Sequence, residues 1–76
     1  PRLSYKEQRL YEVLPAEIEE LEQKIALVEA ELSSPDLYVS DNQRFYKLTE
    51  QLESFKQQKD AKETRWLEIE MLKSSL

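Results

Sequence analysis

The chain has 76 residues, a formal net charge of −5, and no glycine, cysteine or histidine. Without glycine it has neither a phosphate-cradling loop nor a dinucleotide-binding fingerprint. Without cysteine and histidine it lacks a thiol or imidazole nucleophile, a base poised near neutral pH and an ordinary zinc site. The composition therefore argues against catalytic, cofactor-binding and metal-binding roles for this chain.

The remaining composition is that of long, solvated helices. Charged residues make up 36% of the chain, and glutamate, leucine, lysine and glutamine are abundant. No apolar run approaches the roughly 18 residues of a membrane span, and no signal peptide is visible. Because the first residue is proline rather than methionine, we expect the chain to be a piece of a longer protein.

The first predicted element is a short helix over residues 5 to 13. Ser4 followed by Glu7 is the pattern of a capping box, which marks a helix start. Pro15 cannot donate to the carbonyl of Tyr11, and its ring crowds the preceding turn. We therefore expect a kink or break there, with the short helix hinged onto a second helix that begins at Pro15. The alternative is a kink that serves only to curve the helix.

The second predicted element is a long helix over residues 15 to 33. Its apolar residues are separated by alternating steps of four and three, which places one side chain per turn along a coiled-coil seam. These residues are Leu14, Ile18, Leu21, Ile25, Val28 and Leu32.

Residues 33 to 42 predict a turn that closes a hairpin. Proline suits the first position of a short helical turn, so we expect a 3₁₀ turn from Pro35 to Tyr38. Leu37 or Tyr38 would fold over the end of the seam. Ser40 or Asp41 would then cap the next helix.

The third predicted element is a return helix over residues 41 to 74. It repeats the seam spacing, and Lys59 and Lys62 stand where apolar residues are expected. Its apolar seam residues are Phe45, Leu48, Leu52, Phe55, Trp66, Ile69 and Leu76. Antiparallel pairing of Leu32 with Phe45 sets Pro15 opposite Lys62 and Tyr11 opposite Trp66. The predicted fold is an all-α antiparallel two-helix coiled-coil hairpin with a short leading helix, and the whole chain, 1–76, is one domain.

Basic residues gather toward the half of the hairpin that carries Pro15. The candidate nucleic-acid-binding residues are Arg2, Lys6, Arg9, Lys59, Lys62 and Arg65. A basic patch of this kind attracts phosphate. The alternative is that these are solvated helix surface, with pairs such as Lys56 with Asp60, Lys59 with Glu63 and Arg65 with Glu68. Tyrosines can also stack on exposed bases, but Tyr11 and Tyr38 are expected to pack along the seam.

A family resemblance adds to these patterns. The segments LSYKEQRLYEVLP at 3 to 15, DLY at 36 to 38 and RWLEIE at 65 to 70 resemble the C-terminal domain of the Uup-type ABC-F ATPases. The resemblance covers nearly the whole chain. It implies a cytoplasmic protein with two ATP-binding cassettes that use ATP and Mg²⁺, followed by a non-catalytic coiled coil that binds DNA. The parent ATPases act in association with ribosomes.

Three functions remain open from the sequence. The first is a weak, non-specific contact with DNA or ribosomal RNA, made by an accessory domain beside the ATPase cassettes of its own chain. The second is a coiled coil for protein interaction, and the third is a passive spacer that positions the ATPase. In each case we expect a monomer without a membrane partner.

Overall fold

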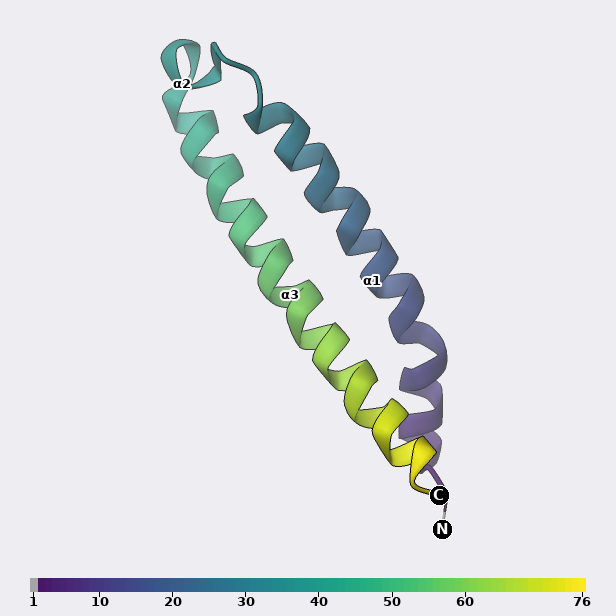
Figure 1. The fold of residues 1–76 in the computed structure, drawn as a ribbon. Coiled ribbons are helices and arrows are strands. Elements are labelled where there is room, and N and C mark those ends of the chain that lie inside the picture. The colour runs from purple at the N-terminus through teal and green to yellow at the C-terminus, as the bar shows by residue number, and fades with distance from the viewer. Residues whose placement is uncertain (1) are drawn as a thin grey trace.

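The computed structural model describes residues 2–76, which contain helices and no strand. Helix α1 spans Tyr5–Leu32, the one-turn helix α2 spans Leu37–Ser40, and helix α3 spans Asn42–Ser74. α1 and α3 lie antiparallel, α2 closes one end, and both termini lie at the other end (Figure 1). We call these ends the tip and the open end. The molecule measures 58 × 16 × 14 Å, and the predicted all-α hairpin is confirmed.

The capping box predicted at the start of α1 is present. The backbone N–H of Glu7 donates to Ser4 Oγ at 3.1 Å, and the backbone N–H of Ser4 donates to Glu7 Oε1 at 3.0 Å. Two of the backbone donors that a helix start leaves unpaired are thereby satisfied. This reciprocal pair defines where α1 begins.

The predicted break at Pro15 is wrong, because α1 runs through this residue without interruption. The helix does change direction in its purple part (Figure 1), as expected where proline removes a backbone hydrogen bond and crowds the preceding turn. Contacts on both sides of Pro15 hold the helix together. Leu14 is only 3% exposed, Tyr11 stacks on Trp66, and Glu17 pairs with Lys62. This packing outweighs a local cost of about 3 kcal/mol.

The 3₁₀ turn predicted from Pro35 to Tyr38 is found only as one three-residue bond, in which the backbone N–H of Leu37 donates to the Ser34 carbonyl at 3.3 Å. Residues Leu37–Ser40 instead form a single α-helical turn. The backbone N–H of Ser40 donates to the Asp36 carbonyl, and that of Asp41 donates to the Leu37 carbonyl, both at 2.8 Å. Both bonds span four residues, which is the α-helical pattern. Leu37 is half-buried at the end of the seam, whereas Tyr38 is exposed.

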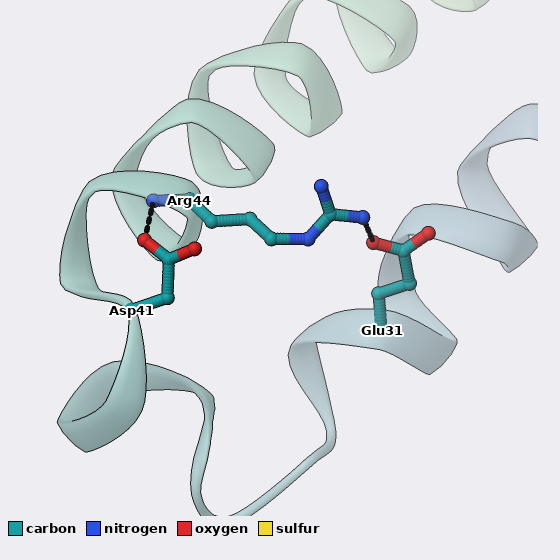
Figure 2. Close-up of polar contacts among 3 residues, drawn as sticks. All are labelled: Glu31, Asp41 and Arg44. Carbon is teal, nitrogen blue, oxygen red and sulfur yellow. Dashed lines mark hydrogen bonds and ion pairs between the residues drawn. The ribbon is translucent and has the colours of Figure 1, made fainter.

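The start of α3 is capped and tied to the end of α1 at the same place. Asp41 Oδ1 accepts from the backbone N–H of Arg44 at 3.1 Å, as predicted for a cap at this position. The Arg44 side chain extends across the hairpin, and its Nη2 donates to Glu31 Oε2 at 2.5 Å (Figure 2). One residue therefore joins the α3 cap to the last turn of α1.

The core is a single seam between the two long helices. The buried side chains are Leu14, Leu21, Val28, Leu48 and Ile69. The predicted register is confirmed at the open end, where the Tyr11 and Trp66 rings stack with their centroids 5.5 Å apart. Midway along the hairpin, Lys24 Nζ lies 5.7 Å from the centroid of the Phe55 ring. Cross-helix contacts thus follow the antiparallel register over most of its length.

Replacement of Leu21 tests the seam. Leu21 is 5% exposed, so Leu21→Asp places a carboxylate in the seam without a partner and costs about 3 kcal/mol or more. A hairpin of this size has a net stability of roughly 3 to 5 kcal/mol. We expect the variant to be largely unfolded in circular dichroism melts.

Leu27→Asp is the matched control, since Leu27 lies on the same helix but is 68% exposed. We expect it to change the free energy of unfolding by no more than about 0.5 kcal/mol. Equal losses in the two variants would show that the seam does not lie where the structure has it.

Candidate nucleic-acid interface

The candidate cations of α1 lie at the open end and are exposed. Arg2 precedes the helix, while Lys6 and Arg9 lie in its first turns. Because Lys6 and Arg9 are three residues apart, they are neighbours on one side of the helix. None of the ion pairs found within residues 2–76 involves Arg2, Lys6 or Arg9. These three charges are therefore available to a ligand.

The three candidate cations of α3 each have an acidic partner. Lys62 Nζ donates to Glu17 Oε1 at 2.8 Å, which joins α3 to α1 beside Pro15. Two further pairs lie within α3, Lys59 with Glu63 at 3.7 Å and Arg65 with Glu68 at 3.8 Å, as predicted. All three pairs are partly exposed, so each stabilises the fold by about 1 kcal/mol or less.

One predicted pair is replaced by a contact between the helices. Lys56 does not pair with Asp60 on its own helix but lies 3.9 Å from Glu29 of α1. A prediction from spacing within one helix overlooks such partners, because they belong to the neighbouring antiparallel helix.

The side chains of Lys59, Lys62 and Arg65 are spread over about a third of the circumference of α3. Successive helical residues rotate by about 100°, so Arg65 lies about 120° around the axis from Lys59, with Lys62 between them. Lys62 reaches across to α1, whereas Lys59 pairs along its own helix. Lys59 and Arg65 therefore face opposite flanks of the hairpin, and the six candidate residues do not form one continuous surface.

Arg65 lies close to the first turn of α1. The pKa of Glu7 is held below its ordinary value, chiefly by the backbone hydrogen bond from Ser4, and the nearby charge of Arg65 lowers it further. Arg65 is therefore near the turn that carries Lys6. Lys6 and Arg9 are neighbours on α1, with Arg2 just before them, and Arg65 lies on α3 near Glu7.

A polar and aromatic cluster packs α3 onto the first part of α1. The Tyr11 hydroxyl donates to Glu70 Oε2, and Lys73 Nζ lies 4.5 Å from the centroid of the Tyr11 ring. The indole N–H of Trp66 is buried and has no partner among residues 2–76. Glu70 and Lys73 were not singled out from the sequence. Their spacing from Trp66, four and seven residues, could have placed them beside Tyr11.

Net charge differs between the two halves of the hairpin. Residues 20–55, which we call the tip half, contain eight acidic and three basic residues. The remainder, which we call the open half, contains eight of each. The whole charge of −5 therefore lies in the tip half, so an anionic ligand is repelled least at the open end.

The described residues show neither a metal site nor a membrane-crossing helix. No group of three or more acidic side chains in residues 2–76 is arranged to hold a metal ion. None of the helices there combines the length and the apolar character that a bilayer crossing requires.

Comparison with known protein families identifies the family of the chain. The sequence model of the ABC transporter C-terminal domain matches residues 2–71. The chain belongs to this family. A C-terminal accessory domain of ABC proteins is not itself the ATP-binding cassette. Searches of curated proteins and of solved structures returned no match.

Leucine substitutions show which lysine the fold of this ABC transporter C-terminal domain tolerates, Lys59, and which one stabilises it, Lys62. Lys59→Leu removes only a weak pair with Glu63 and puts an apolar side chain at a half-buried position beside the seam. We expect the melting temperature to stay the same or rise. Lys62→Leu breaks the shorter contact with Glu17, and we expect it to lower the melting temperature. A large loss from Lys59→Leu would show that this lysine has a structural partner beyond Glu63.

The hydrogen bond of Tyr11 predicts a dependence of stability on pH. The bond to Glu70 raises the pKa of Tyr11 above its ordinary value of 10.0. The unfolded chain therefore loses this proton first as the pH rises. The stability that the bond contributes is complete below about pH 10 and is lost as the pH passes through the raised pKa.

Tyr11→Phe keeps the ring stacked on Trp66 but removes the hydroxyl. We expect it to be less stable than the parent at pH 8 and to lose that deficit at strongly alkaline pH, as measured by urea unfolding. A difference between the two proteins that does not change with pH would contradict the contact with Glu70.

Proposed function

We propose that this ABC transporter C-terminal domain gives a Uup-type ABC-F ATPase a weak, non-specific contact with nucleic acid. The ligand is DNA or the RNA of the ribosome, and the domain acts in the cytoplasm beside the ATP-binding cassettes of its own chain. Catalysis and the binding of ATP and Mg²⁺ belong to those cassettes. The Uup-type assignment rests on the motifs LSYKEQRLYEVLP, DLY and RWLEIE.

The observation that carries this proposal is the group of exposed cations at the open end. Arg2, Lys6 and Arg9 form none of the ion pairs seen in residues 2–76. Arg65 lies beside the same turn, near Glu7. Because lysine and arginine contact phosphate regardless of sequence, such a group supports binding to the backbone rather than to bases.

The candidates on α3 contribute less directly than Arg2, Lys6 and Arg9. Lys62 pairs with Glu17 and Arg65 pairs with Glu68, so a phosphate must compete with a carboxylate for each cation. Lys59 lies toward the opposite flank and pairs with Glu63. About four effective phosphate contacts predict a slope near −3 for log affinity against log salt, and dissociation constants of roughly 1 to 100 μM.

Charge reversal distinguishes this surface from the tip. We expect Lys6→Glu combined with Arg9→Glu to weaken binding strongly, because both exposed charges then repel phosphate. Charge reversal of Arg44 and Lys47 changes the net charge by the same amount at the tip, and we expect it to weaken binding less. Fluorescence anisotropy with duplex DNA, branched DNA and ribosomal RNA fragments at several salt concentrations measures both effects.

Three outcomes would contradict the proposal. Binding that is indifferent to salt, or a larger loss from the tip reversals, would exclude the open end as the interface. Absence of binding to all three ligands would favour a passive spacer. A mass that rises with protein concentration would favour a self-associating coiled coil.

A further inference from the structure

The tip carries an exposed aromatic cluster that the proposed function does not use. Tyr38 lies edge-on to Phe45 and to Tyr46, with ring centroids 5.3 and 6.0 Å apart, and Phe45 and Tyr46 are 5.8 Å apart. Phe45 is half-buried, but Tyr38 and Tyr46 are 52% and 54% exposed. Val39, between them in sequence, is 86% exposed. Apolar surface is thus presented to solvent at one end of the molecule.

Contacts within the turn and at the start of α3 hold the cluster in place. Ser40 Oγ and the Ser40 backbone N–H both donate to the Asp36 carbonyl, which closes the turn that bears Tyr38. The Asp41 cap and the Arg44 to Glu31 contact fix the first turn of α3 (Figure 2). The hydroxyls of Tyr38 and Tyr46 lie 3.4 Å apart. Such a surface loses little conformational freedom when it binds a partner.

The charge around the cluster determines which partner fits. A shallow depression beside Tyr46 is lined by Asp41, Gln43, Arg44, Lys47 and Glu50. Arg44 already forms an ion pair with Glu31. Lys47 is the remaining cation there, and the tip half as a whole carries the net charge of −5. A phosphate-rich ligand is repelled by this field, whereas a positively charged one is attracted.

We infer that the tip is a docking surface for a basic polypeptide segment whose arginine side chains lie against Tyr38 and Tyr46. Arginine suits this surface because its guanidinium group stacks on aromatic rings and pairs with carboxylates. Asp36 and Glu50 are exposed and form none of the ion pairs seen in residues 2–76. This surface is independent of the cations at the open end.

Synthetic peptides test the inference directly. We use an eight-residue peptide of alternating arginine and glycine, with versions in which lysine or neutral citrulline replaces arginine. In ¹H–¹⁵N spectra we expect the arginine peptide to shift the amides of residues 36–47 most. It should bind more tightly than the lysine peptide of equal charge, and the citrulline peptide should bind weakest.

Substitution of the two tyrosines measures their contribution to peptide binding. Tyr38→Ala combined with Tyr46→Ala should weaken binding of the arginine peptide roughly 5-fold to 30-fold. Tyr38→Leu combined with Tyr46→Leu keeps apolar bulk at the tip and should weaken it as well. Tyr5→Ala is the matched control, because Tyr5 is 86% exposed at the open end, and it should leave the affinity unchanged.

Several results would overturn the inference. Equal affinity for the arginine and lysine peptides, with shifts spread along the glutamates of α1, would show attraction by net charge alone. Absence of binding would exclude the site. A single-stranded oligonucleotide that bound the tip in a manner dependent on both tyrosines would show a nucleic-acid surface instead. Lys6→Glu with Arg9→Glu should not weaken peptide binding, so this test and that of the proposed function can fail separately.

Discussion

The whole structure depends on one seam between two helices. A hairpin 16 Å by 14 Å in cross-section has no second layer, so each helix buries a single stripe of side chains. Among residues 2–76, five are buried along it, and Ile69 is the one that is fully covered. Contacts along the seam must therefore offset the free-energy cost of each local irregularity. At Pro15 they do so through Leu14 and the stack of Tyr11 on Trp66, which keep α1 helical across a residue that removes one of its hydrogen bonds.

The same geometry separates two surfaces along the molecule. Both termini lie at the open end, with the cations Arg2, Lys6 and Arg9, and α2, which carries the exposed Tyr38, lies at the tip (Figure 1). Because the extent is 58 Å and the Debye length at physiological salt is about 8 Å, the two ends act independently on charged ligands. A basic surface and an acidic, aromatic one can thus coexist on a chain whose net charge is −5.

Periodicity and the length of the turn together predicted the hairpin and its register, because pairing Leu32 with Phe45 across the turn sets apolar residues opposite each other. It placed Tyr11 against Trp66 correctly. Local propensity failed at Pro15 and at residues 37–40, where tertiary contacts and side-chain hydrogen bonds decided the conformation. The ion pair predicted for Lys56 from spacing within one helix was also wrong, because Lys56 pairs with Glu29 across the seam. Of the candidate interface, the sequence identified the basic residues but not that Lys59 and Arg65 face opposite flanks.

Amide hydrogen exchange followed by NMR tests most directly whether α1 is one helix held by α3 through Pro15. The backbone N–H of Gln8 already donates to the Ser4 carbonyl at 2.9 Å, so amides from this residue to Leu14 are hydrogen-bonded in the structure. We expect these amides to be protected, with opening free energies approaching those of residues 18–28. Exchange of residues 8–14 at the rate of an unfolded chain, beside a protected second part of the helix, would contradict the continuous helix and restore a joint at Pro15.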